Sequence, residues 1–274
     1  MIAARIQTVG IVGLGRMGRP MARCLLRAGF SVRGVDPDPA AAEGARHDGV
    51  VLAPDCAELA RLSDSILVLA GFESQVEQIL FGPQGIVAGA GPGAPVMIAS
   101  TVSPSYMRTV PERLAAIPVL DTPVARGEKA AESGSLLVYA GGDSATLARC
   151  QPILEAVAER VFHLGAVGAG QAAKAINNML LWSCVCATVE GLDLGDALGI
   201  DRESLREALC HGSGANWAME TRADERPALW AEKDMAIVLR EAEAAGVALP
   251  MGGAVREAIS AFKVARNLPA PSEG

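Results

Sequence analysis

Short apolar runs alternate with amphipathic stretches over roughly the first 165 residues of the chain. The runs are too short for helices and end at polar residues or glycines, which is typical of buried strands. Strands are predicted over Ile6–Val12, Ser31–Asp36, Ser65–Ala70, Pro95–Ala99 and Val119–Asp121. Helical periodicity follows at Met17–Ala28, Ser74–Leu80 and Pro104–Leu114, and a later helix, Ala145–Val157, lies between strands Leu136–Ala140 and Val161–Leu164. Alternation of this kind predicts a parallel sheet with helices on both of its faces.

The pattern changes after Gly165. Gln171–Leu198 keeps a helical period without proline and is far longer than a crossover helix needs to be. We interpret it as the interdomain helix on which a second, all-helical domain is founded. Further helices are predicted over Asp201–Leu209, Lys233–Ala245 and Gly252–Ala265, and a frayed tail over Leu268–Gly274. The predicted organisation is a sheet domain over 1–165 and an all-α substrate and oligomerisation domain over 166–274.

Composition and charge narrow the classes of function. Half of the 274 residues are apolar, which describes a chain with a sizeable core, and the formal net charge of −7 disfavours a nucleic-acid partner. No stretch reaches about 18 uninterrupted apolar residues, so no membrane span is expected. The six cysteines form no Cys-x-x-Cys pair, which favours free thiols in a reducing cytoplasm over a disulfide framework or a metal site.

A glycine motif follows the first predicted strand. Gly13-Leu14-Gly15-Arg16-Met17-Gly18 matches Gly-x-Gly-x-x-Gly between a strand and a helix, and Asp36 ends the next strand. In a Rossmann domain the glycines let the chain turn tightly and approach a dinucleotide pyrophosphate, and the acid accepts hydrogen bonds from the adenine ribose. An acid there repels a 2′-phosphate, so we expect NAD rather than NADP. A turn residue before Pro37 is the plainer interpretation of Asp36, and both can hold.

Two later segments are candidates for the chemistry. The loop that starts at Asp121 follows a strand end, where open α/β sheets bind ligands. Lys174 lies in the first turns of the long helix, and Asn178, four residues on, shares its face. A polar stripe on an otherwise apolar helix is costly unless it serves a site. The alternatives are an ordinary turn and a solvated surface lysine.

Together these segments resemble the β-hydroxyacid dehydrogenase family, of the 3-hydroxyisobutyrate dehydrogenase, tartronate semialdehyde reductase and sulfolactaldehyde reductase type. Four blocks carry the resemblance in the order of the family: Gly13–Ala22 (GLGRMGRPMA), Asp121–Gly134 (DTPVARGEKAAESG), Gly165–Asn178 (GAVGAGQAAKAINN) and the pair Lys233-Asp234. They span nearly the whole chain.

The resemblance implies hydride transfer between NAD(H) and a small anionic β-hydroxy acid or semialdehyde. Lys174 is then the general acid/base and Asn178 helps to hold the substrate. Ala125, Arg126 and Gly127 form the substrate loop, Lys233 is a cation on the substrate or cofactor side, and Leu69, Ala70 and Thr101 join the glycine motif and Asp36 at the cofactor. An ammonium is no base, so Lys174 is expected to have its pKa lowered from about 10.4 by burial beside Arg126 or Lys233.

Departures from the family pattern keep alternatives open. The family loop reads Pro-Val-Ser-Gly-Gly, and here Ala125 and Arg126 replace the serine and the first glycine. A guanidinium binds a carboxylate or sulfonate with two hydrogen bonds, but Arg126 can also point to solvent or pair with Glu128. Segment Ala70-Gly71-Phe72 lacks the usual proline. An imine reductase-like enzyme and a catalytically silent NAD-binding module, serving as a sensor or an interaction domain, remain alternatives. The apolar faces of the long helix predict a homodimer or homotetramer.

Overall fold

The computed structural model describes residues 6–114, 116–222, 230–265 and 267. The predicted frayed tail, Leu268–Gly274, lies outside the described residues. The chain divides into two compact units, the first ending at Lys174 and the second beginning at Ala175. Each unit is described separately below.

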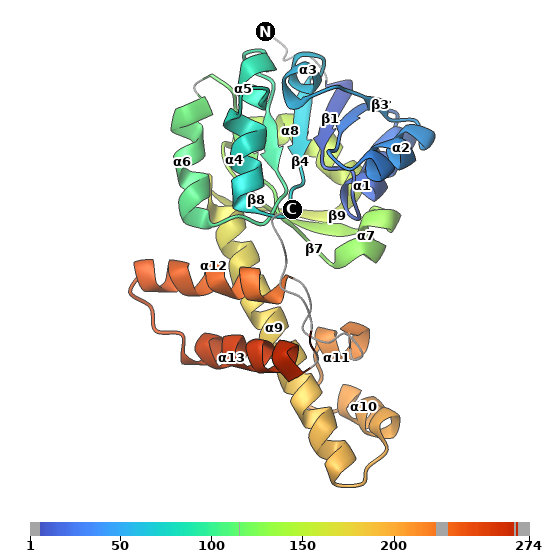
Figure 1. Ribbon diagram of the computed structural model, residues 1–274, viewed down its shortest axis with the longest axis vertical. Coiled ribbons are helices and arrows are strands. Elements are labelled where there is room, and N and C mark those ends of the chain that lie inside the picture. The colour runs from blue at the N-terminus through green and yellow to red at the C-terminus, as the bar shows by residue number, and fades with distance from the viewer. Residues whose placement is uncertain (1–5, 115, 223–229, 266, 268–274) are drawn as a thin grey trace. The chain divides into compact units, whose positions relative to one another are not determined.

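A mostly parallel sheet forms the centre of the first unit (Figure 1). Its strands are β1 (Thr8–Val12), β2 (Ser31–Val35), β3 (Val51–Leu52), β4 (Ser65–Val68), β5 (Val96–Ile98), β6 (Val119–Asp121), β7 (Val124–Ala125), β8 (Leu136–Gly141) and β9 (Ala158–Gly165). They lie in the order β3-β2-β1-β4-β5-β6-β8-β7, with β9 paired to β8. Pairing is parallel from β3 to β6 and antiparallel where β8 meets β6 and β7. This arrangement confirms the predicted Rossmann-type fold.

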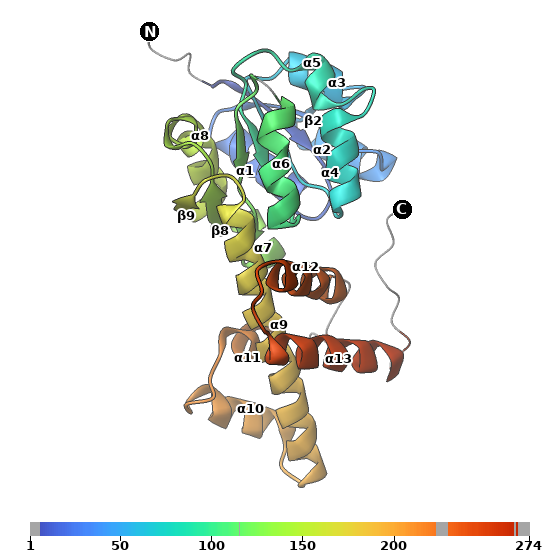
Figure 2. The same ribbon diagram turned by 90° about the vertical axis from the view of Figure 1, so that its left-hand side faces the viewer.

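Helices cover both faces of this sheet (Figures 1 and 2). They are α1 (Gly18–Arg27), α2 (Pro39–His47), α3 (Cys56–Arg61), α4 (Glu73–Phe81), α5 (Ile86–Gly89), α6 (Pro104–Leu114), α7 (Gly127–Ser133) and α8 (Ser144–Val157). One buried cluster joins α1 and α8 to the sheet, and a second joins α3, α4 and α6 to its other face. The central strands β1, β4, β5 and β6 are therefore buried on both sides, as their continuous apolar runs predict, whereas β9 is largely exposed.

Several short elements carry too little periodicity to be predicted. Helices α2 and α3 begin at local caps, since the Asp38 side chain accepts from Ala40 N at 2.9 Å and the Asp55 side chain from Glu58 N at 2.8 Å. Such caps stabilise a first turn without an apolar stripe. Strands β3 and β7, two residues each, depend on pairing with distant parts of the chain.

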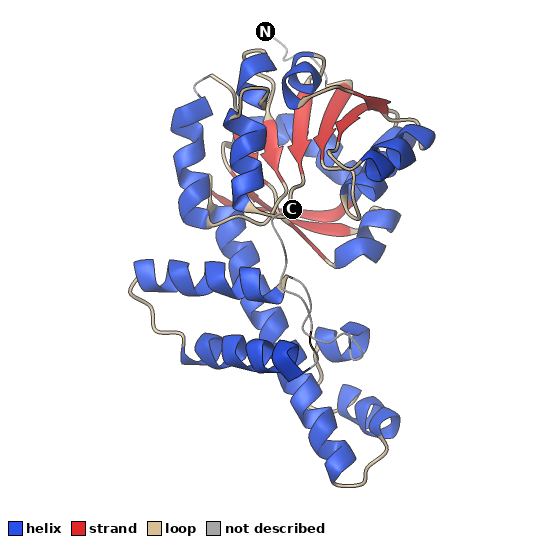
Figure 3. Cartoon of the chain, viewed as in Figure 1, coloured by secondary structure: helices blue, strands red, loops and turns tan. Residues whose placement is uncertain are grey.

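The second unit is helical (Figure 3). It takes most of α9 (Ala169–Ala197) together with α10 (Arg202–Cys210), α11 (Trp217–Arg222), α12 (Ala231–Ala244) and α13 (Pro250–Ala265). Its core includes Trp182, Val185, Met235 and Ile259. In the described part of the chain no helix is long and apolar enough to cross a membrane.

Candidate active site

The glycine turn between β1 and α1 has the geometry that a pyrophosphate site requires. Gly13 has a φ of 94°, and a Cβ on it would overlap the carbonyl oxygen of Leu69. A Cβ on Gly18 would overlap the carbonyl oxygen of Gly13, whereas a Cβ on Gly15 meets nothing within 4 Å. The first and third glycines thus serve close packing inside the protein. The second leaves open space beside the backbone, as an approaching phosphate needs.

Asp36 reaches back to this turn from the end of β2. Its Oδ2 accepts from Leu14 N at 2.6 Å, and its Oδ1 accepts from Asp38 N at 2.8 Å. A carboxylate has about four acceptor sites, so these two bonds leave capacity for ribose hydroxyls. The Leu14 side chain is buried in the core, and Arg16 is exposed and paired with Glu128 at 2.7 Å. Met17 is the residue before α1.

The loops after β4 and β5 are tied together by side chains. Ser100 Oγ accepts from Ala70 N at 2.6 Å, which joins the two segments expected to contact the cofactor. The Gln75 amide oxygen accepts from Gly71 N at 3.0 Å and Phe72 N at 3.2 Å. A glutamine one turn into α4 therefore holds this loop, which lacks the proline usual in the family.

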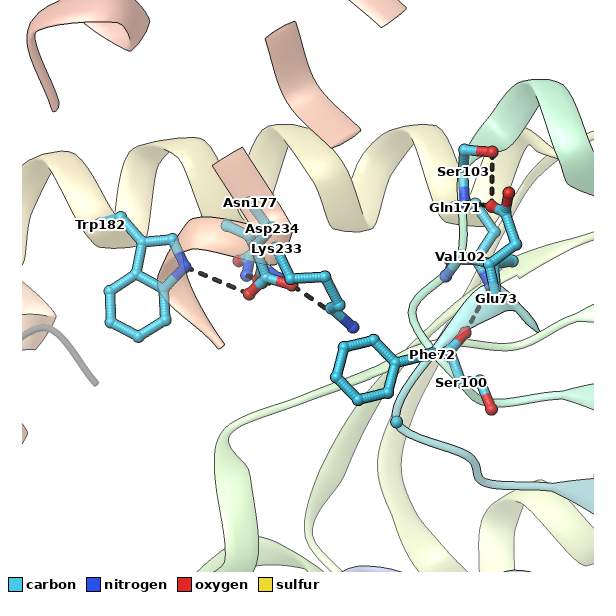
Figure 4. Close-up of polar contacts among 12 residues, drawn as sticks. Phe72, Glu73, Ser100, Val102, Ser103, Gln171, Asn177, Trp182, Lys233 and Asp234 are labelled. Carbon is cyan, nitrogen blue, oxygen red and sulfur yellow. Dashed lines mark hydrogen bonds and ion pairs between the residues drawn. The ribbon is translucent and has the colours of Figure 1, made fainter. Parts of the chain in front are cut away.

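A glutamate links the starts of α4 and α6. Glu73 Oε2 accepts from both the backbone N of Ser103, at 2.8 Å, and its hydroxyl, at 2.6 Å (Figure 4). The carboxylate thus lies where α6 begins, which the helix dipole favours. Thr101 lies between this contact and the Ser100 bond in the chain, so its loop is held on both sides.

Asp121 fixes the beginning of α9. It is fully buried at the end of β6, and its two carboxylate oxygens accept from Gly168 N at 2.8 Å and Gln171 N at 2.7 Å. Burial raises the pKa of Asp121, and these backbone donors act against that rise. Lys174 is the next residue of α9 on this side, partly buried, three positions after Gln171. The lysine thus stands on a helix whose first turn is anchored to the carboxyl end of the sheet.

In the predicted substrate loop, the Arg126 side chain makes contacts within the protein. Ala125 is buried at the end of β7, and Arg126 has a left-handed backbone with φ 84°, followed by Gly127 at φ 75°. The Arg126 guanidinium donates to Ser135 O at 3.1 Å and pairs with Glu159 on β9. It does not pair with Glu128, the partner suggested by its proximity in sequence.

A buried polar cluster in the second unit contains Asn178. Asp234 Oδ2 accepts from Trp182 Nε1 at 3.2 Å (Figure 4). It also accepts from Asn178 Nδ2 at 2.9 Å, and all three side chains are buried. A carboxylate only accepts, so the Asn178 amide turns its NH₂ toward it. The Asn178 Oδ1 in turn accepts from Asn177 Nδ2 at 3.2 Å. Lys233 Nζ lies 3.8 Å from Asp234 Oδ1.

Lys233 also lies over an aromatic ring. Its ammonium is 5.3 Å from the centre of the Trp230 ring, within cation–π range. The cation is therefore placed by an aspartate on one side and an indole on the other.

The structure thus brings together Leu69, Ala70, Thr101 and the glycine turn within the first unit, and Lys174 and Asn178 along α9. It also gives specific hydrogen-bond partners, which the sequence did not predict, to Ser100, Gln171, Trp182 and Asp121. The role of Asp121 could have been recognised in the sequence, because an acid at the last position of a buried strand needs hydrogen-bond donors. Within the described residues, no three His, Cys, Asp or Glu side chains gather as a metal site would require, and all six cysteines are free.

Two family models match the chain in succession. Residues 8–165 match the NAD-binding domain of 6-phosphogluconate dehydrogenase. Residues 168–268 match the NAD-binding domain of NADP-dependent 3-hydroxyisobutyrate dehydrogenase.

Characterised relatives and a solved structure agree with these matches. The chain is 33% identical to 3-hydroxyisobutyrate dehydrogenase of Pseudomonas aeruginosa, over 92% of this chain and 91% of the relative. It is 32% identical to L-threonate dehydrogenase of Cupriavidus necator, over 92% and 89%. The structure of Mycobacterium tuberculosis 3-hydroxyisobutyrate dehydrogenase with L-serine is 31% identical, covers 94% of each chain and superposes with a TM-score of 0.85. The glycine turn, the anchored lysine helix and these full-length likenesses lead to one conclusion: the chain belongs to the β-hydroxyacid dehydrogenase family, as a nicotinamide-dependent oxidoreductase with a Rossmann fold.

Proposed function

We propose that this enzyme transfers a hydride between NAD(H) and a small anionic β-hydroxy acid or the corresponding semialdehyde, with Lys174 as general acid/base. The observation that carries the proposal is the position of Lys174 in α9. Its helix starts on Asp121 at the end of β6, beside the loops after β4 and β5. Open α/β sheets bind ligands at these carboxyl ends of the strands.

The cofactor residues present fit a dinucleotide. The open space at Gly15 and the free N-terminus of α1 suit the pyrophosphate, and Asp36 suits the adenine ribose. The acid Asp38 lies two residues on, so two carboxylates oppose a 2′-phosphate, and the nearby Arg33 lies inside β2. NAD is therefore the proposed cofactor. When bound, it supplies the hydride acceptor or donor.

The proton route belongs to the protein. Lys174 takes the alcohol proton during oxidation and returns it during reduction. Asn178, whose amide is oriented by Asp234, holds the substrate, and Lys233 supplies a second cation for an anionic substrate or the cofactor. Transfer between a lysine and a hydroxyl needs hydrogen-bond distance, so a helix fixed to the sheet favours it.

Arg126 is the proposed specificity residue of the substrate loop. A guanidinium binds a carboxylate or a sulfonate with two parallel hydrogen bonds. Glu159 occupies that guanidinium in the structure, so an anionic substrate has to compete with it. The proposed substrate class is accordingly one with a strong, compact anionic group.

Exposed apolar residues on α9 support self-association. Ile176, Leu180 and Leu194 on α9, and Leu198 directly after it, are each more than half exposed. A homodimer or homotetramer buries such residues, and sedimentation of the purified enzyme gives the number of subunits.

A substrate panel followed at the NADH absorbance band tests the proposal. Hydroxy acids, semialdehydes and sulfonated analogues are compared, with cyclic imines included for an imine reductase-like activity. Turnover of an anionic substrate, lost in Lys174→Ala while NADH fluorescence still reports binding, supports the proposal. Turnover of imines alone contradicts it. NADH binding without turnover of any compound favours the silent module.

A further inference from the structure

The Gln171 side chain is a buried amide whose nitrogen and oxygen each make a hydrogen bond. It is 1% exposed in the first turn of α9. Its Nε2 donates to Ser100 O at 2.8 Å, and its Oε1 accepts from Val102 N at 3.2 Å. The amide therefore pairs with the peptide groups on both sides of Thr101, as a neighbouring strand would (Figure 4).

The same residue is fixed from its backbone. Gln171 N donates to the buried Asp121 carboxylate at 2.7 Å. Gly170 allows this approach, because a Cβ on it would overlap the carbonyl oxygen of Tyr139. Ser100 extends the connection to β4, since its hydroxyl accepts from Ala70 N at 2.6 Å. Ends of β4, β5 and β6 are thus joined to one turn of helix.

Lys174 follows Gln171 by three residues, so it lies about 4.5 Å further along the helix axis and on the same side of the helix. We propose that Gln171 is a positioning residue: its amide holds the Thr101 loop at a fixed distance from Lys174, so that the cofactor loop and the acid/base move as one body. This inference depends on the proposed function, in which Thr101 lies at the nicotinamide ribose and Lys174 moves the proton.

Gln171→Met tests the positioning role of Gln171, because methionine has a similar length but cannot make either of the two hydrogen bonds. The Ser100 carbonyl and the Val102 amide lose their partners, and the loop can shift relative to Lys174. A misplacement of about 1 Å lowers catalysis by about 100-fold. The expected result is a fall in kcat of this order, a larger primary deuterium isotope effect on kcat/KM, and an NADH Kd within about threefold of the wild type. Gln151→Met is the matched control and keeps the wild-type rate: Gln151 is a partly buried residue of α8 whose amide donates to Glu155 at 2.9 Å.

Gln171→Glu is the second variant, in case the first fails to fold. An ionised glutamate keeps the acceptor for Val102 N but turns an anionic oxygen toward Ser100 O. Protonation restores a hydroxyl donor there, so its rate relative to the wild type should rise as pH falls. Desolvation and the negative charge of Asp121, which accepts from the backbone N of residue 171, raise the pKa of the introduced acid, and the charge of Lys174 lowers it. If the rate of Gln171→Glu relative to the wild type does not change with pH, the result contradicts the positioning role of Gln171.

The double variant of Gln171→Met with Lys174→Ala separates this inference from the proposed function. If Gln171 acts through Lys174, its substitution changes the residual rate of Lys174→Ala by less than about threefold, far from additivity. An equal fold-loss in both backgrounds, or a wild-type rate in Gln171→Met, overturns the inference and leaves the proposed function intact. A near-wild-type rate in Lys174→Ala overturns the proposed function instead.

Discussion

Replacing Arg126 by glycine separates its role in the fold from its role in substrate binding. The substitution removes a left-handed residue with a side chain, which relieves about 1–2 kcal/mol. Glycine adds about 0.5–1 kcal/mol of unfolded-state freedom, and the exposed pair with Glu159 contributes about 0–1 kcal/mol. These contributions largely cancel, so the free energy of unfolding should change by less than about 1 kcal/mol.

Substrate binding responds differently if Arg126 holds the anionic group. A hydrogen bond to a charged group contributes about 1.5–3 kcal/mol, so the KM for an anionic substrate should rise about 10- to 150-fold in Arg126→Gly. Urea unfolding and initial rates with a carboxylate and a sulfonate substrate measure the two effects.

The partner of Arg126 gives the reverse test. Glu159→Gln removes the internal competitor and should lower the KM for the same anions by up to about fivefold, because the exposed pair is weak. Glu155→Gln, on α8, is the matched control with an unchanged KM. An unchanged KM in both Arg126→Gly and Glu159→Gln refutes the role of Arg126 in substrate binding.

Three further substitutions test other parts of the structure. Asp36→Ala should raise the KM for NAD about tenfold and leave that for NADP nearly unchanged, because the ribose loses an acceptor; an equal rise for both coenzymes contradicts the assignment. Gly141→Ala should lower the thermal midpoint, since its Cβ would overlap the buried Asp121 carboxylate and overpacking destabilises by about 1–3 kcal/mol; an unchanged midpoint argues against the close approach. Trp182→Phe should raise the substrate KM through Asn178, because the acceptor that orients its amide loses one donor, and a wild-type KM speaks against that connection.

Periodicity was sufficient to predict the long elements. Strand β1 and helix α9 came out within about two residues of their observed ends, because buried apolar positions repeat along each of them. Asp36 was predicted to end the strand after the glycine motif, and in the structure it follows β2 and its carboxylate accepts from the Leu14 backbone. Such features can be predicted because the residues that form them are close in sequence, or lie on strands whose order is known for this kind of fold.

The side-chain partners of the site could not be predicted in this way. The Gln171 amide is buried against a loop 71 residues away, a contact that helical periodicity does not predict. Glu128 was considered as an ion-pair partner for Arg126 because it is two residues away. In the structure the partner is Glu159, which is 33 residues away. Such pairs depend on the order of the strands in the sheet, which brings distant residues together, and no local pattern encodes that order.

The pH dependence of hydride transfer in Lys174→Ala tests the central claim most directly. In the wild type, kcat/KM for alcohol oxidation should fall on the acidic side with unit slope, because a protonated amine accepts no proton. In the variant that acidic limb should disappear and the remaining rate should be at least about 100-fold lower, with NADH still bound. An acidic limb retained in Lys174→Ala at a near-wild-type rate would show that another group carries the proton.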